Sequence, residues 1–391
     1  MKIKKIILYQ FNRAFRIKFH SSQTLRTKAE SIVVQLEFEN GILGYGESTP
    51  TTYTTGESCS SVAQIIQDCF SPILFNHRIN KIDDVERVLN ELENECLKRK
   101  VFQYNSALGG IDIALLDALG KLQELPMTDL LGPIIRENIP YSISIPFLSQ
   151  KSIQEGFLQI QKFEFKFIKV LLGASERENI ERVSLVRSLF GEYVDIRVDV
   201  NERWKFQQAI SNLEKLQKFH ITAVEQPLAK DNIAGLVALR KEINIPIIVD
   251  ESMCSLDDAK TLIESEACDI LNIKISKCGG LVRSKRIAHF AQSQNIQCQL
   301  GAHVGETEIL VAAGKYFAFT TQNLVYFEGC SFLLFEESWR NNQIEARSKR
   351  EAGNSNFGLG LGATTLQSIQ NYCELIVELV DGNEGKTVGK N

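Results

Sequence analysis

The sequence predicts an α/β protein that combines a parallel (β/α) barrel with a smaller α+β domain. From Tyr141 to Gly329, eight short apolar runs alternate with amphipathic stretches, and eight strands are the number that closes a parallel barrel. The chain before them has β-rich runs followed by helical periodicity, the order typical of an α+β domain. With 391 residues, of which 44% are hydrophobic, the chain is long and apolar enough to bury two cores.

The first domain, predicted over residues 1–135, begins with two strand-forming runs. These are IKKIILYQF and SIVVQLEFENGILGYGE, and the second run turns at Asn40-Gly41. A polar loop is predicted between them, over residues 16–28. From Glu57 to Leu131 the apolar residues take up helical spacing, as in VERVLNELENECL and ALGGIDIALLDALGKLQ.

The barrel is predicted over residues 136–330. Its strands are expected near residues 141–147, 165–173, 194–201, 221–227, 245–251, 270–276, 296–301 and 324–329. Amphipathic helices such as RENIERVSLVRSLF separate most of them. Residues 331–391 are expected to return to the first domain, with a helix-like stretch from Thr365 to Leu379 and a mobile polar tail.

The charge balance gives no reason to expect nucleic acid or an anionic membrane as partner. The net charge is −4, with 44 basic and 48 acidic residues, so a small-molecule partner is favoured. The opening MKIKKIILYQF is too short in its apolar part for a secretory signal, and no segment reaches the length of a membrane span. We therefore expect a cytoplasmic protein. The nine cysteines include no CxxC pair and indicate neither a disulfide framework nor a zinc site.

Three acidic residues end successive apolar runs: Asp199, Glu225 and Asp250, and a fourth run ends at Lys274. The steps are nearly equal, at 26, 25 and 24 residues (225 − 199, 250 − 225 and 274 − 250). Equivalent strand ends of a parallel barrel meet at one rim, so these side chains are expected to converge. Carboxylates are oxygen ligands suited to Mg²⁺.

A divalent ion at these acids would offset the charge that forms when a proton is removed beside a substrate carboxylate. Lys274 is the candidate base, and we expect burial near a cation to lower the pKa of its ammonium. Asn201, Glu251 and Lys277 are the candidates for orienting the metal ligands or their waters. Simple capping of strand ends, or a surface lysine leading a glycine turn, are the competing interpretations.

The motifs DVN, VEQP, VDES and NIKISKCGG, in this order and spacing, resemble the enolase superfamily, specifically its muconate lactonizing subgroup. The resemblance implies a modified (β/α) barrel with an α+β capping domain built from both ends of the chain. It also implies Mg²⁺ held by Asp199, Glu225 and Asp250, acid/base catalysis by Lys274, and loops over residues 16–28 and 50–55 that close over the substrate. Relatives in this family are commonly homo-oligomers.

One departure from the family concerns the second barrel strand. The subgroup carries a Lys-x-Lys pair there, and EFKFIKVLLG places Lys169 at the first lysine and Leu171 at the second. In the family the second lysine is the acid/base opposite the one matched by Lys274. Leucine cannot transfer a proton, so this departure argues against the usual proton transfer between two faces of the α-carbon. Lys169 is retained as a candidate catalytic residue.

The seventh strand is followed by LGAHVGETE, which presents His303 and Glu306. His303 is a candidate acid/base or substrate ligand, because it lies at the end of a barrel strand. Glu306 is either a substrate contact or a charge at a helix start. The other candidate substrate-binding residues are Glu328 on strand eight and His20, Arg26 and Tyr53 in the capping loops.

These observations predict a magnesium-dependent enzyme that removes the α-proton of a carboxylate substrate, with Lys274 as principal base. The main hypothesis is cycloisomerisation or elimination on one face. The alternative is a racemase or epimerase of an amino acid derivative or dipeptide, with Lys169 or His303 as second acid/base. A further alternative is a metal-dependent carboxylate-binding protein without turnover.

Overall fold

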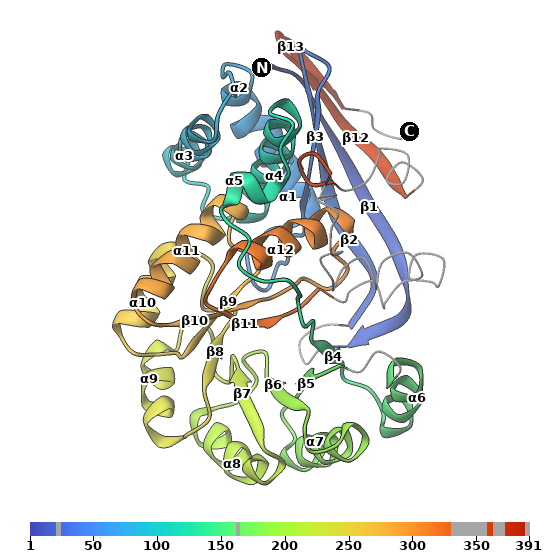
Figure 1. Cartoon of the computed structure of the whole chain (residues 1–391), viewed down its shortest axis with the longest axis vertical. Coiled ribbons are helices and arrows are strands. Elements are labelled where there is room, and N and C mark those ends of the chain that lie inside the picture. The colour runs from blue at the N-terminus through green and yellow to red at the C-terminus, as the bar shows by residue number, and fades with distance from the viewer. Residues whose placement is uncertain (21–24, 162–164, 330–357, 363–371, 388–391) are drawn as a thin grey trace.

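The computed structural model describes residues 1–391 except 21–24, 162–164, 330–357, 363–371 and 388–391. Two sheets dominate the described chain: a five-stranded sheet in the order β13-β12-β1-β2-β3 and an eight-stranded sheet in the order β11-β10-β9-β8-β7-β6-β5-β4. Figure 1 shows the eight-stranded sheet curled, with helices around its outside. This is the predicted modified barrel with a capping domain.

The capping domain packs helices on one face of an antiparallel sheet. Its strands are β1 (Ile3–His20), β2 (Leu25–Phe38), β3 (Leu43–Ser48), β12 (Cys373–Val380) and β13 (Asn383–Thr387). Its helices are α1 (Cys59–Ile65), η1 (Ile66–Phe70), α2 (Ser71–Leu74), α3 (Ile82–Lys98), α4 (Asn105–Leu122) and α5 (Met127–Leu131). Helix α4 lies close on β3: a Cβ atom at Gly46 would be only 1.9 Å from the Gly110 carbonyl oxygen. Glycine is therefore required at this crossing.

Both ends of the chain contribute to this sheet, because β12 pairs antiparallel with β1 and also with β13. Two predictions for the C-terminal segment are wrong. Residues 373–379 of the expected helix belong to strand β12 (Cys373–Val380), because pairing with β1 outweighs the local helical periodicity. The polar tail, expected to be mobile, forms strand β13 over Asn383–Thr387; residues 365–371 of the predicted helix and the last four residues lie outside the described chain.

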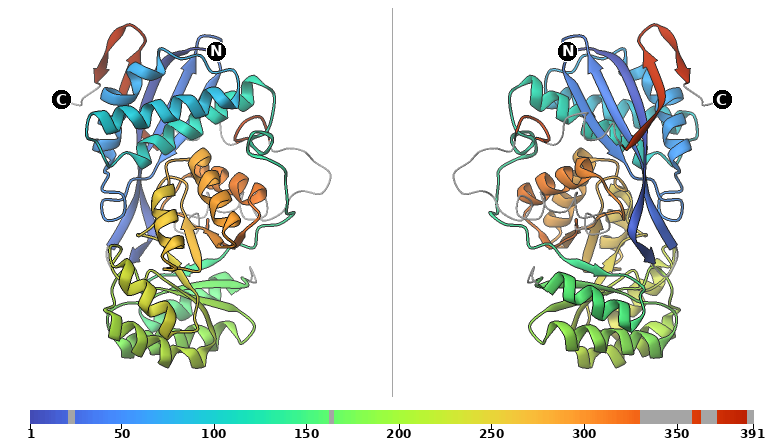
Figure 2. Two further views of the ribbon diagram at one scale, coloured as in Figure 1. Left: turned by 90° about the vertical axis from the view of Figure 1, so that its left-hand side faces the viewer. Right: turned by 90° about the vertical axis from the view of Figure 1, so that its right-hand side faces the viewer.

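The loop predicted over residues 16–28 is also corrected. Strands β1 and β2 continue through most of it as a long hairpin, with Phe19 paired to Arg26. Figure 2 shows this hairpin reaching from the capping sheet down to the barrel. The polar sequence had suggested a solvated loop, but the pairing of the two strands satisfies the backbone groups in extended form. The hairpin thereby carries capping-domain residues to the rim of the barrel.

All eight predicted barrel strands are present. They are β4 (Ile143–Ile145), β5 (Phe167–Leu171), β6 (Asp195–Asp199), β7 (Ile221–Glu225), β8 (Ile247–Val249), β9 (Ile270–Ile273), β10 (Gln297–Leu300) and β11 (Leu324–Phe327). Every neighbouring pair is parallel. The Ser142 N–H donates to the Phe327 carbonyl at 2.7 Å, which joins the two edges of the sheet.

Helices connect the barrel strands and cover their outer face. They are α6 (Gln150–Ile160), α7 (Glu176–Phe190), α8 (Phe206–Leu216) with η3 (Gln217–Phe219), α9 (Ile233–Glu242), α10 (Leu256–Glu264), α11 (Leu281–Ser293) and α12 (Glu308–Thr320). No helix in the described ranges is long and apolar enough to cross a membrane. The residue boundaries of the three segments, 1–135, 136–330 and 331–391, stay a prediction.

Candidate active site

A cavity of about 70 Å³ lies at the carboxyl ends of the barrel strands, beneath the β1–β2 hairpin. Most of its lining consists of residues that end barrel strands, and the rest comes from the capping domain. The lining residues are Phe19, Arg26, Tyr53, Ser144, Lys169, Leu171, Asp199, Asn201, Lys274, Ala302, His303, Val304 and Glu328. Of the four residues that were expected to converge, Asp199 and Lys274 line this cavity.

The three acids lie on or just after three adjacent strands. Asp199 ends β6 and is the register partner of Glu225, which ends β7, while Asp250 follows β8. All three are buried. Burial raises the pKa of Glu225 to about 7 and also raises the pKa of Asp199, because a desolvated carboxylate is disfavoured. A nearby cation would stabilise both carboxylates.

In the structure two lysines supply that positive charge. The Lys169 ammonium lies 3.1 Å from Asp199 Oδ2 and 3.2 Å from Glu225 Oε1. It also lies 2.8 Å from Glu328 Oε1. Burial acts to lower the pKa of Lys169, but the three carboxylates outweigh it and raise the pKa well above its usual value. Lys169 is therefore an inward-facing, charged group at the floor of the cavity.

Lys274 pairs with the third acid, its Nζ lying 2.5 Å from Asp250 Oδ2. Lys277 donates to the other carboxylate oxygen of Asp250, at 2.7 Å, and to its backbone carbonyl. The expectation of a lowered pKa at Lys274 assumed a bound cation and stays a prediction. Burial is the largest single effect and acts to lower that pKa, but the carboxylates of Asp250, Glu225 and Glu251 together raise it above its usual value. A cation held by Asp250 would oppose this attraction and shift the balance back.

The donor set suits a hard divalent ion. In the described ranges no three acidic, histidine or cysteine side chains converge on one point as they stand, and the ammonium groups of Lys169 and Lys274 lie among the acids. Glu251 next to Asp250 is buried, and its Oε2 has no hydrogen-bond partner among the described residues. Asn201 Nδ2 donates to the other oxygen of Glu251, at 3.4 Å. Buried oxygen atoms in this number fit Mg²⁺.

Besides Lys169, side chains from two other strands hold Glu225. Asn272 Nδ2 donates to Glu225 Oε1 at 2.8 Å, and Gln299 Nε2 donates to Oε2 at 3.0 Å. The fully buried Arg197 guanidinium in turn donates to Gln299 Oε1 at 2.6 Å and to Ser142 Oγ at 2.8 Å. Sequence reasoning missed Gln299 and Ser142. For Gln299 a signal existed, since it shares a strand face with Gly301 at the rim.

Leu171 takes the position that the resemblance assigned to a second lysine. It is buried at the end of β5, where it is the register partner of Asp199, and it lines the cavity. Lys274 follows β9, four places away from β5 in the order of eight strands. Strands four apart in a curled eight-stranded sheet lie on opposite sides. The cavity therefore has the Lys274 ammonium on one side, and the isobutyl group of Leu171 together with the Lys169 ammonium on the other.

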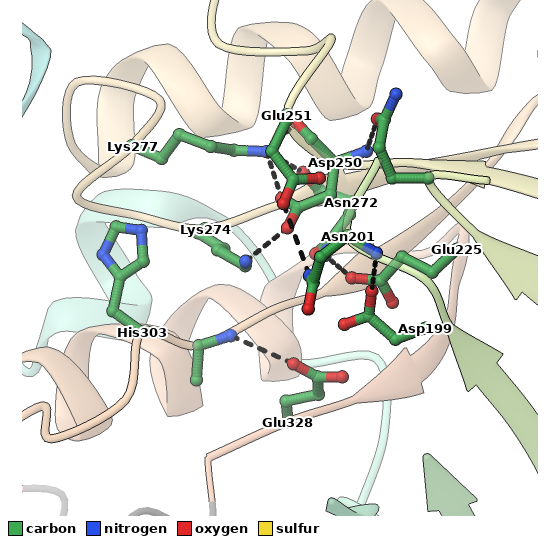
Figure 3. Close-up of polar contacts among 12 residues, drawn as sticks. Asp199, Asn201, Glu225, Asp250, Glu251, Asn272, Lys274, Lys277, His303 and Glu328 are labelled. Carbon is green, nitrogen blue, oxygen red and sulfur yellow. Dashed lines mark hydrogen bonds and ion pairs between the residues drawn. The ribbon is translucent and has the colours of Figure 1, made fainter. Parts of the chain in front are cut away.

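His303 follows β10, the strand beside β9, and Figure 3 shows its ring next to Lys274. It does not lie opposite Lys274, so it does not replace the missing lysine. Glu306 Oε1 accepts from the His303 backbone N–H at 2.6 Å. Burial raises the pKa of Glu306 to about 8. Glu306 is outside the lining of the cavity, so the helix-start interpretation describes its position better than substrate contact.

The capping domain brings two predicted residues to the cavity. Arg26 Nη1 donates to the Val304 carbonyl at 3.1 Å, and its guanidinium lies 6.0 Å from the centre of the Tyr53 ring. Glu328 directly follows β11 and also lines the cavity, where its carboxylate forms an ion pair with Lys169. The side chain of His20 lies outside the described part of the structure, so its predicted role stays untested.

Comparison with known proteins agrees with this site. Residues 152–365 match the enolase C-terminal domain-like family. Residues 4–132 match the N-terminal domain of mandelate racemase and muconate lactonizing enzyme. The chain belongs to the enolase superfamily. Its matching regions include the barrel strands that carry the three acids and Lys274.

Among relatives, the N-succinyl-L-Arg/Lys racemase of Bacillus cereus is 27% identical over 377 residues, which cover 96% of this chain and all of that protein. Its crystal structure has a TM-score of 0.87, at 28% identity, and covers 97% of this chain and all of the other. The hydrophobic dipeptide epimerase of Enterococcus faecalis is 28% identical over 332 residues, covering 83% of this chain and 89% of that protein.

A crystal structure of the Enterococcus faecalis dipeptide epimerase contains Mg and the dipeptide L-Leu-L-Tyr. Its TM-score is 0.83 at 25% identity, with 93% of this chain and all of the other covered. The 2-chloromuconate cycloisomerase of Rhodococcus opacus matches in fold, with a TM-score of 0.85 at 23% identity over 96% of this chain and all of the other. These relatives favour the racemase or epimerase alternative over the cycloisomerisation that the sequence analysis put first.

Proposed function

We propose that the protein is a magnesium-dependent racemase or epimerase of an N-acylated amino acid or a dipeptide. Asp199, Glu225 and Asp250 would hold the ion, which when bound offsets the negative charge that develops on the substrate carboxylate. Lys274 would remove the α-proton from one face. The observation that carries the proposal is the position of the Lys274 ammonium, in the lining of the cavity and 2.5 Å from Asp250. The substrate class comes from the relatives.

Lys169 is the proposed acid/base for the opposite face. It lies on β5, the strand opposite β9, and its side chain lines the cavity together with Leu171. An ion bound at Asp199 and Glu225 would compete with the Lys169 ammonium for the same oxygens and weaken its hold on them. His303 is the weaker candidate for this role, because it lies beside Lys274.

A second function is favoured by Leu171. If Lys169 stays bound to its three carboxylates, Lys274 is the only group at the α-carbon that transfers a proton, and both steps occur on one face. Such a site supports elimination or cycloisomerisation, or returns the proton with retention. It does not invert the α-carbon.

The two functions are separated by following stereochemistry in deuterated water. N-succinyl-L-arginine, N-succinyl-L-lysine and L-Ala-L-Glu are incubated with the protein and Mg²⁺, and the α-proton signal and the enantiomers are measured. Deuterium entering with inversion supports the racemase or epimerase. Deuterium with retention, or release of an unsaturated product, supports the one-faced reaction. If none of these compounds binds or exchanges its α-proton, the proposed substrate class is wrong.

A further inference from the structure

His303 is a buried side chain with unused hydrogen-bonding capacity. It is 4% exposed and lines the same cavity as Lys274. Neither of its ring nitrogens has a hydrogen-bond partner among the described residues. The neighbouring carboxylate of Glu306 accepts from the backbone N–H of His303 instead of from the ring. The rest of the described protein therefore leaves both nitrogens available to a ligand.

Such an arrangement is costly unless something in the cavity bonds to the ring. A buried polar group without a partner destabilises a fold by an amount that packing alone does not recover. Polar groups of this kind are retained where they serve binding or catalysis. The absence of partners for the ring nitrogens therefore indicates that a group of the substrate bonds to them.

The charge around His303 restricts which group that is. Burial lowers the pKa of the imidazole far below its usual value, and the nearby cations Lys274, Arg26 and Lys277 lower it further, against the opposing effect of Asp250. The ring is thus neutral, with one N–H donor and one acceptor nitrogen. An ammonium group beside Lys274 and Arg26 would be repelled.

We infer that His303 binds the uncharged amide attached to the substrate's α-carbon, and so selects amino acids whose amino group is acylated over free amino acids. An amide offers both an N–H donor and a carbonyl acceptor, whereas the ammonium of a free amino acid offers only donors and a positive charge. The inference rests on the proposed function, since it places the amide beside the α-carbon from which Lys274 removes the proton. In this role His303 determines specificity and does not transfer the proton.

The test compares two ligands that differ in the amide. N-α-acetyl-L-lysine carries it, and 6-aminohexanoate has the same carboxylate and side chain without it. Binding of each is measured by calorimetry, with Mg²⁺ present, for wild type, His303→Met, His303→Asn and Val304→Ala. Met removes both ring nitrogens, Asn restores a donor and an acceptor, and Val304→Ala controls for a change of cavity shape.

We expect His303→Met to weaken binding of N-α-acetyl-L-lysine about tenfold, the effect of one buried hydrogen bond, and to leave 6-aminohexanoate unchanged. His303→Asn should stay within about threefold of wild type for both ligands. Val304→Ala should change the affinities for both ligands by the same factor. The Tm of His303→Met should equal or exceed that of wild type, because an unbonded polar group is replaced by an apolar one.

Three results would overturn the inference. Equal weakening of both ligands by His303→Met would show a general packing role, and a marked loss of Tm would show that the ring bonds within the fold. Loss of α-proton exchange in His303→Asn, with binding retained and a changed pH profile, would make His303 an acid/base. If wild type binds neither ligand, the proposed function itself fails. Binding to wild type thus distinguishes failure of the proposed function from failure of the inference about His303.

Discussion

Leu171 and Lys274 line one cavity from strands four places apart in the eight-stranded sheet. Lys169 lines the same cavity from the strand that carries Leu171, and this arrangement gives the first prediction. Leu171→Lys adds an amine beside Lys169, the proposed acid/base of that face, so in deuterated water the ratio of inversion to retention at the α-carbon should stay within about threefold of wild type. Leu171→Met is the control, since it keeps the volume and adds no ionisable group. A rise of about 100-fold in that ratio for a folded Leu171→Lys protein would show that Lys169 does not serve that face.

Magnesium should stabilise the protein through the three acids. At a free concentration 100 times its Kd, an ion that binds only the folded state raises the free energy of unfolding by about 2.7 kcal/mol. Asp199→Asn should abolish this increase. Asp195→Asn, at the other end of the same strand, should keep it. Denaturant unfolding with Mg²⁺ and with a chelator measures the effect, and stabilisation of Asp199→Asn equal to that of wild type would place the ion elsewhere.

The fully buried Gln299 should set the affinity of the site for the ion. It donates to Glu225 Oε2 and accepts from Arg197. Gln299→Leu therefore removes a hydrogen bond that holds Glu225, a proposed metal ligand, and removes the acceptor of a buried Arg197 nitrogen. We expect Mg²⁺ affinity to fall about 10- to 100-fold and stability to fall by about 1–3 kcal/mol. Gln297→Leu, on the same strand but exposed, is the matched control. Calorimetric titration of Mg²⁺ checks this, and equal affinities for the two variants would contradict it.

Glu306 should make stability fall as pH rises. Its folded pKa is raised by burial to about 8 from the ordinary value of 4.5. Between those pH values the unfolded chain loses a proton that the folded state keeps, so this group's contribution declines by up to about 1.4 kcal/mol per pH unit. Glu306→Gln should flatten the decline between pH 5 and pH 8, in about the range those pKa values set. Glu308→Gln is the control, and urea unfolding at several pH values should show no flattening in it.

The sequence predicted the barrel because its signal is local. Each strand is a short apolar run that ends at a polar or charged residue, and the near-equal steps between Asp199, Glu225 and Asp250 reported the strand-helix repeat directly. The extension of β1 and β2 through residues 16–28 and strand β12 escaped prediction because pairing between segments decides them. Lys169 was predicted as a candidate catalytic residue, but its three carboxylate partners come from three other strands, and no spacing along the chain encodes that.

The surroundings of His303 could not be predicted from the sequence either. The sequence placed it at a strand end, and only the folded arrangement puts it beside Lys274 with both ring nitrogens available. The expected homo-oligomer stays a prediction, because a single chain does not test it.

The central claim is that Lys274 removes the α-proton, and exchange of that proton with deuterated water tests it most directly. With N-succinyl-L-lysine and Mg²⁺, wild type should exchange the α-proton, and Lys274→Ala should lose about 10²- to 10⁴-fold in rate. The variant should still be stabilised by Mg²⁺, which shows that the acids remain in place. Exchange by Lys274→Ala at a rate close to that of wild type would contradict the account.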